Sequence, residues 1–201
     1  MQPIQALKRY HAAIRLSIEQ AWEWSHISLK TLHLLRHAKA ADRDATESDA
    51  ERPLADRGVV ACQALAMHLA ASSFSVERIY CSPARRTKET YSLIKGSLGN
   101  ATVSYREKLY LISASDLLEM IAEVPNKVAS IMVIGHNPGL HMAALRLTRR
   151  ASDGADADLD AMMKKFPTGA LCSLRFEAEC WSDVIRDSGT LISFIRPRDL
   201  G

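Results

Sequence analysis

Hydrophobic residues are concentrated in short runs along this chain, and between the runs the apolar positions recur every three or four residues. The runs cover residues 29–36, 76–81, 102–105, 131–134, 171–176 and 191–195. Their short length and their content of Leu, Ile, Val and Tyr are typical of strands. A strand that is apolar along most of its length is expected inside a sheet that is covered on both faces.

The segments between these runs combine helical spacing with residues that favour helix ends. We expect helices over residues 57–71, 84–97, 115–124 and 138–147. The third is expected to start from the Ser115-Asp116 pair and to end before Pro125, and the fourth carries Pro138 in its first turn. Alternation of strand and helix predicts an α/β protein, built as a three-layer α/β/α sandwich around a mostly parallel central sheet.

Two charge-rich segments interrupt this alternation. Residues 41–56 are predicted to form a long polar loop. The aspartates at positions 153, 156, 158 and 160 are interpreted as a solvated face, because their spacing misses the glycine and glutamate positions of a calcium loop.

Residues 1–28 are predicted to form an amphipathic helical extension that precedes a single domain at residues 29–201. Apolar residues with helical spacing lie there, at Ile4, Leu7, Ile14, Ile18 and Trp22. The functional alternatives are a transit peptide, a membrane-surface helix and a partner-docking helix. The acidic residues Glu19 and Glu23 favour a simple appended helix, or translation from a start upstream of the true one.

Composition narrows the class of protein further. With 201 residues, of which 47% are hydrophobic, the chain can bury the core of one domain. A net charge of +3 without a stripe of Lys and Arg argues against nucleic acid as a partner, and no segment has the length of a membrane span. The four cysteines, at positions 62, 81, 172 and 180, lack C-x-x-C spacing and follow no secretory signal. We therefore expect reduced thiols and a cytoplasmic location.

Basic side chains lie at the ends of three of the predicted strands or within a few residues after them. Arg36 and His37 end the first strand, Arg86 follows the strand at residues 76–81, and His136 follows the strand at residues 131–134. Open α/β sheets keep their chemistry at the carboxyl ends of their strands, so these side chains are expected to meet. Arginine grips two phosphoryl oxygens at once, and a neutral imidazole can attack phosphorus. The set predicts phosphoryl transfer through a phosphohistidine, without a metal or other cofactor.

The remaining histidines are interpreted as structural or surface residues. His33 alternates with buried leucines, and His68 and His141 lie in predicted helices. His33 and His37 are four residues apart but belong to a predicted strand and its end, not to a helix, and His136 and His141 are five residues apart. Neither pair therefore has the helical H-x-x-x-H frame of a zinc site, and no cysteine stands nearby in the sequence. No metal site is therefore expected.

Four short motifs in one order resemble a known family. They are Leu-Leu-Arg-His-Ala-Lys at 34–39, Arg-Pro-Leu at 52–54 with Gly58 after it, Cys-Ser-Pro-Ala-Arg-Arg at 81–86, and Ile-Gly-His-Asn-Pro-Gly at 134–139. Together they resemble the histidine phosphatase superfamily, and in particular its SixA-type phosphohistidine phosphatases. The segment 166–170 is similar to the one that leads into a late strand of that family. The resemblance runs from about Leu29 to the C-terminus, and it implies a phosphoglycerate mutase-like fold.

The resemblance also implies roles for individual residues. His37 is expected to be the nucleophile, Arg36 and Arg86 to grip the phosphoryl oxygens, and His136 to donate to the phosphoryl group in the transition state. Arg85, beside Arg86, is expected to face elsewhere. Arg52 and Asn137 are expected to line the pocket. The family usually has Gly after the nucleophile where this chain has Ala38, a small change that is not expected to inactivate the site.

A general acid is the remaining part of such a site. Phosphate esters need a carboxylic acid to protonate the departing alkoxide, and Glu107 is the candidate by position. The alternative for Glu107 is a surface residue in salt bridges with its two basic neighbours.

The expected activity is a phosphatase that acts through phospho-His37 on a phosphorylated protein, namely on protein phosphohistidine. One alternative is a phosphatase for small phosphate esters such as sugar phosphates or nucleotides. The other is a phosphate-binding module without turnover, against which the presence of the nucleophilic histidine argues.

Overall fold

The core of the protein is a six-stranded sheet, seen here in a computed structural model that describes residues 28–42, 48–72, 74–150 and 156–200. The strands are β1 (Leu29–Arg36), β2 (Arg78–Cys81), β3 (Thr102–Tyr105), β4 (Ser130–Gly135), β5 (Leu171–Glu177) and β6 (Thr190–Ile195). Their order across the sheet is β3-β2-β4-β1-β5-β6. Strands β1 to β4 are parallel, whereas β5 runs antiparallel to both β1 and β6. The mostly parallel sheet predicted from the sequence is confirmed.

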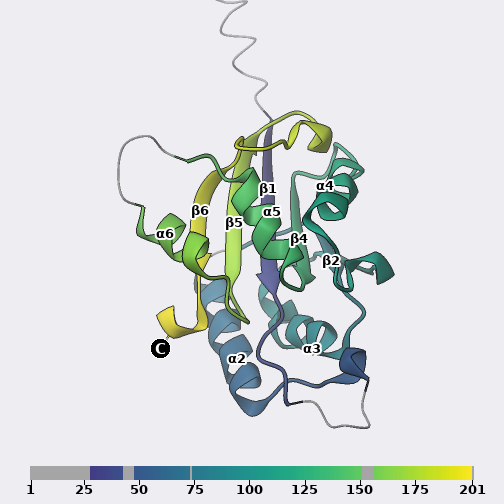
Figure 1. Cartoon of the computed structure of the whole chain (residues 1–201), viewed down its shortest axis with the longest axis vertical. Helices are drawn as coiled ribbons and strands as arrows, with labels where there is room; N and C mark the ends of the chain where they lie inside the picture. The colour runs from purple at the N-terminus through teal and green to yellow at the C-terminus, as the bar shows by residue number, and fades with distance from the viewer. Residues whose placement is uncertain (1–27, 43–47, 73, 151–155, 201) are drawn as a thin grey trace, which may run out of the picture.

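Helices cover both faces of this sheet. They are α2 (Asp56–Ala71), α3 (Arg85–Ile94), α4 (Ala114–Ala122), α5 (Gly139–Leu147) and α6 (Ala157–Lys164). In Figure 1, α5 crosses in front of the sheet with α4 and α6 on either side of it, whereas α2 emerges from behind. The strand β1 contributes side chains to both faces of the sheet, because successive residues of a strand point to opposite sides. Leu32 and Leu34 pack into the core under α4, α5 and α6, whereas Leu35 packs into the core under α2 and α3.

Two segments differ from the sequence prediction in their local structure. Helix α4 is capped by Ser113 rather than by Ser115, since the Ser113 hydroxyl accepts a hydrogen bond from the backbone N–H of Asp116. The segment that was expected to be an acidic solvated face contains helix α6. Asp156 caps this helix, and its buried Met162 joins the core. Asp158 accepts a hydrogen bond from the backbone N–H of Phe194, so that aspartate links α6 to β6 rather than serving solvation alone.

Other sequence predictions fall outside the described residues. The predicted amphipathic extension at residues 1–28 lies outside them except for Ser28, and the aspartate at position 153 belongs to the undescribed segment 151–155. The domain boundary at residue 29 therefore stays a prediction. None of the helices in the described ranges is long and apolar enough to cross a membrane.

His33 gives the fold a pH-dependent stability that can be measured. Its ring is buried, lies 4.5 Å from the Phe74 ring and shares a 2.9 Å hydrogen bond with the Ser173 hydroxyl. Burial lowers the pKa of His33 from 6.5 to about 4, so the unfolded chain binds the extra proton first as the pH falls. The free energy of unfolding should therefore decrease between pH 6.5 and about pH 4.

The variant His33→Gln removes the titrating ring and keeps a hydrogen-bonding side chain for Ser173. The free energy of unfolding of both proteins is measured by urea titration at several pH values. Over that interval it should decrease in the variant by on the order of 3 kcal/mol less than it decreases in the wild type. The variant His68→Gln, at an exposed position of α2, controls for histidine replacement in general. Identical pH dependence in the His33 variant and the wild type would refute this prediction.

Candidate active site

The carboxyl ends of three neighbouring strands converge on one pocket. Because β2, β4 and β1 are adjacent and parallel, the residues that follow them emerge side by side at the lower end of Figure 1. The pocket has a volume of about 250 Å³. Six of the residues that the sequence singled out line it, namely Arg36, His37, Arg52, Arg86, His136 and Asn137.

Backbone contacts hold the segment after β1 in place. The N–H of His37 donates to the carbonyl of Gly135, which ties the end of β1 to the end of β4. Gly169 reaches back and donates to the carbonyls of both Arg36 and His37. Gly58 lets helix α2 approach closely, since a Cβ there would collide with the backbone of Lys39. These contacts fix the backbone around His37 from three directions.

His37 is held as a neutral imidazole with one nitrogen left for chemistry. Its Nδ1 lies 2.7 Å from the Ala38 carbonyl oxygen, which can only accept, so Nδ1 carries the proton and Nε2 keeps its lone pair. Burial and the positive charges of Arg86 and Arg36 lower the pKa of His37 to about 4, against the opposing hydrogen bond to Ala38. At neutral pH this ring is therefore a neutral imidazole whose unprotonated Nε2 can act as the nucleophile.

His136 stands opposite, with its ring centre 5.1 Å from that of His37. A guanidinium nitrogen of Arg86 donates to Nδ1 of His136 at 3.3 Å, so Nε2 carries the proton and donates to the Ser82 hydroxyl at 2.8 Å. Burial and the nearby positive charges lower the pKa of His136 to about 3. A phosphoryl dianion beside Nδ1 would favour protonation there, which is the form needed for the donor role that the resemblance implies.

Adjacent arginines at the start of α3 point in different directions. Arg86 is buried and turns into the pocket, where it contacts Asp49 and His136. Arg85 is 48% exposed in its side chain and pairs with Glu89 one helical turn later, at 2.8 Å. A step of one residue along the helix, which turns the side chain by about 100°, thus separates a pocket cation from a surface cation.

Asp49 is one of the described site residues that sequence reasoning missed. It lies on the short turn η1 (Asp49–Glu51), and its carboxylate accepts hydrogen bonds from Arg52 at 2.9 Å, Tyr110 at 2.8 Å and Arg86 at 3.1 Å. These partners, Arg52 first, hold the pKa of Asp49 well below its usual range. Nothing in the sequence distinguishes Asp49 from the other acids of the segment 41–56, because its partners come from distant parts of the chain.

The contacts of Asp49 fix two of the pocket arginines before any substrate arrives. Arg86 also donates to the Asp49 backbone carbonyl at 2.5 Å, and Arg52 donates to the carbonyl of Ala41 at 2.7 Å. Cations that are already in position need no reorganisation when negative charge develops nearby.

Arg36 and Asn137 meet at a shared backbone oxygen. Each donates to the Phe166 carbonyl at 2.9 Å. Within the described ranges, Nε of Arg36 and Oδ1 of Asn137 are buried and have no hydrogen-bond partner. Unpartnered buried polar atoms are unusual in folded proteins and often mark a functional site.

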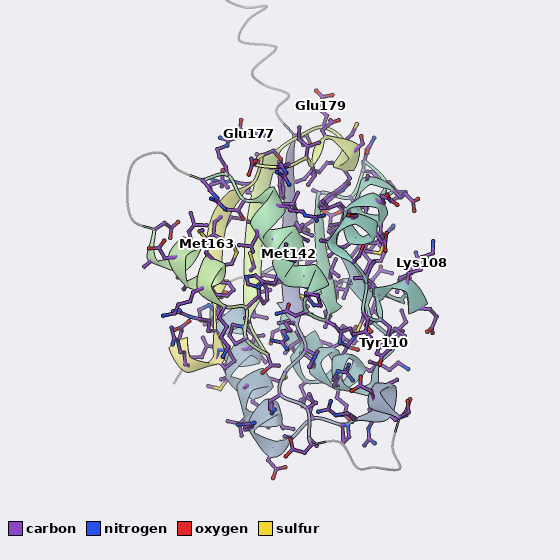
Figure 2. All side chains as sticks on the ribbon, viewed as in Figure 1. Lys108, Tyr110, Met142, Met163, Glu177 and Glu179 are labelled. Carbon is purple, nitrogen blue, oxygen red and sulfur yellow. The ribbon has the colours of Figure 1, made fainter. Side chains whose placement is uncertain are left out.

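Glu107 lies outside this pocket. It is exposed on the turn η3 (Glu107–Leu109) and lines a separate hollow with Tyr80, Arg106 and Met120. Figure 2 shows the side chain of the neighbouring Lys108 at the outer edge of the molecule. A general acid must come within hydrogen-bond reach of the leaving group, so the expected proton-donor role of Glu107 loses its geometric support.

Comparison with known proteins agrees with the geometry of the pocket. The family model of the histidine phosphatase superfamily (branch 1) matches residues 32–137, which contain every strand end described above. The chain belongs to the histidine phosphatase superfamily. The uncharacterised protein Rv1276c of Mycobacterium tuberculosis is 32% identical over 165 residues, covering 82% of this chain and all of that protein.

Solved structures of this superfamily show the same fold. A protein from Nakamurella multipartitia assigned as the phosphohistidine phosphatase SixA is 28% identical, with a TM-score of 0.72 over 84% of this chain and 96% of that one. Its counterpart from Agrobacterium tumefaciens is 26% identical, with a TM-score of 0.68 over 84% of this chain and 98% of that one. The phosphoglycerate mutase-like α/β/α fold that the sequence resemblance implied is confirmed.

Proposed function

We propose that this protein is a phosphatase that removes the phosphoryl group from phosphohistidine in a protein by way of phospho-His37. Nε2 of His37 attacks phosphorus in line, a new N–P bond forms, and the N–P bond of the substrate breaks to release its imidazole. Water then attacks phospho-His37, which releases inorganic phosphate and restores the free histidine.

Other pocket residues would stabilise the phosphoryl group while it is transferred. Arg36, Arg52 and Arg86 supply positive charge around the phosphoryl oxygens, and arginine suits this role because its planar fork binds two oxygens at once. His136 lies on the other side of the pocket from His37, where a proton on its Nδ1 would neutralise charge on the transferring group.

We choose a phosphoramidate over an alkyl ester as the substrate class because the described pocket lacks a proton-donating carboxylic acid. None of the residues that line the described pocket has a carboxyl group, and the neighbouring Asp49 is held ionised by its arginine partners. The imidazole of phosphohistidine departs as a neutral or readily protonated group, whereas an alkoxide must receive a proton as its bond breaks. A site with little acid to offer therefore suits a phosphoramidate better than an alkyl ester.

The similar solved structures support the same class, since two of them are assigned as the phosphohistidine phosphatase SixA. The pocket is also small and open to the surface, which would admit a side chain carried on another protein.

A cytoplasmic location is part of the proposal. Three of the four cysteines are buried as free thiols, and burial raises the pKa of Cys62 to about 11.

A substrate panel tests this proposal. The wild type should show a higher kcat/KM for phosphoramidates than for alkyl phosphates of similar size. The variant Glu107→Gln should leave both rates unchanged, because that side chain lies in a different hollow. If alkyl phosphates are preferred and this variant loses about 10²-fold on them, the protein is a small-ester phosphatase that uses Glu107 as its acid. No turnover of any substrate would indicate a phosphate-binding module.

A further inference from the structure

A second and larger hollow adjoins the active site. Its volume is about 510 Å³, roughly twice the 250 Å³ of the catalytic pocket. It lies between the end of α6 and the turn η5 (Pro197–Asp199), which appear side by side at the left of Figure 1 near the C-terminus. We call it the basic groove, and its lining includes Lys164, Lys165, Pro167, Thr168, Pro197 and Arg198.

A thin wall separates the basic groove from the nucleophile. Thr168 lines both hollows, and Gly169 follows it with a φ of +77°, a conformation that glycine adopts readily. The place that a Cβ on Gly169 would occupy is 2.8 Å from Pro197 of the groove and 4.0 Å from Cα of Ala38, beside the nucleophile. One end of a ligand bound in the groove would thus lie next to the catalytic pocket that binds the phosphoryl group.

The groove carries positive charge that the catalytic step does not use. Lys164, Lys165 and Arg198 are exposed, and among the described residues no carboxylate is within ion-pair distance of either lysine. Asp199 and Asp158 are acids near the groove, but Arg196 binds Asp199 at 2.6 Å and also interacts electrostatically with Asp158. Arg198 is 3.8 Å from Asp199, with its side chain 76% exposed. Cations left in solvent beside a site attract a partner of opposite charge.

We propose that the basic groove docks an acidic segment of the phosphoprotein substrate next to its phosphorylated histidine, an inference that rests on the proposed function. The walls supplied by Pro167 and Pro197 offer apolar contact between the charges, which suits a peptide that carries carboxylates. Among the described residues that line the groove there is no aromatic side chain on which a nucleobase could stack, so a single-stranded nucleic acid fits it less well.

Two phosphohistidine peptides test the proposal, one with Asp and Glu around the phosphorylated residue and one with Asn and Gln in their place. A small phosphoramidate serves as the substrate that cannot reach the groove. The wild type should favour the acidic peptide by about tenfold in kcat/KM, mainly through KM, and raising the salt from about 0.05 M to about 0.5 M should reduce that preference.

The triple variant Lys164→Gln, Lys165→Gln and Arg198→Gln should lose about tenfold on the acidic peptide and keep the wild-type rate on the small phosphoramidate. The matched control replaces Lys95, Lys108 and Lys127 by glutamine, since these are also exposed but lie outside the groove. Figure 2 shows Lys108 on the side of the molecule opposite α6. The control should behave as the wild type does.

The outcomes separate this inference from the proposed function. Turnover of the small phosphoramidate with equal rates on both peptides, or equal losses in the two triple variants, overturns the docking proposal and leaves the proposed function standing. No turnover of any phosphoramidate overturns the proposed function itself. Tighter binding of an RNA oligomer or of phosphatidylglycerol vesicles than of the acidic peptide, lost in the groove variant, would assign the groove to that other anion and overturn the proposal.

Discussion

Replacing His37 with alanine should abolish turnover, with kcat lower by about 10⁴-fold or more, and should leave the protein without a phosphoenzyme. The wild type, stopped during turnover, should carry an acid-labile and base-stable phosphate on His37. The physical reason is that Nε2 of His37 holds the free lone pair, since Nδ1 is committed to the Ala38 carbonyl. Arginine and His136 can stabilise the transferring group but offer no replacement nucleophile in that position.

Radiolabelling with quenched-flow sampling, followed by acid and base treatment, measures the phosphoenzyme. The variant His68→Ala, at an exposed position of α2, should keep both the label and the activity. Circular dichroism should show both variants folded. A label on serine or cysteine, or appreciable turnover by His37→Ala, would contradict the covalent mechanism.

Replacing Arg86 with alanine should lower kcat by about 10²-fold or more, the scale of losing one preorganised charge donor. Its side chain is buried, and Asp49 and His136 fix its direction, so its charge faces the transferring group without cost of reorganisation. Arg86→Lys should recover little of the loss, because an ammonium cannot reproduce the planar fork.

The neighbouring residue supplies the matched control for this experiment. Arg85→Ala removes the same side chain one position earlier on the same helix, from a site where it pairs with Glu89. Its kcat should stay within about twofold of the wild type, since exposed ion pairs contribute little. Steady-state kinetics on one phosphoramidate compares the variants, and equal losses at the two positions would show that Arg86 has no special place in the pocket.

Many of the helices and strands could be predicted from the sequence because their signals are local. Strand β1 was predicted at its observed bounds, Leu29–Arg36, since its apolar run is bordered by polar residues. Helix α6 was missed because it has eight residues and its acidic composition hides the buried Met162. Such a short helix depends on packing against β6 more than on its own propensity.

The pocket could be predicted in part for a related reason. Residues at the carboxyl ends of parallel strands lie at the same edge of the sheet, so Arg36, His37 and His136 can be grouped from the sequence alone. Asp49 and Glu107 could not be placed in this way. Asp49 reaches the pocket through contacts with Arg86 and Tyr110, which lie far from it in the chain, whereas the turn η3 leaves Glu107 exposed in another hollow.

The sequence by itself determined the layered α/β architecture, the family and the set of basic residues, because periodicity and short motifs are properties of neighbouring positions. The tertiary structure alone decided which nitrogen of His37 is free, that Asp49 stays ionised between its arginines, and that a basic groove opens beside the pocket. Those features depend on hydrogen bonds, burial and charges brought together from distant segments, and such distances exist only once the chain has folded.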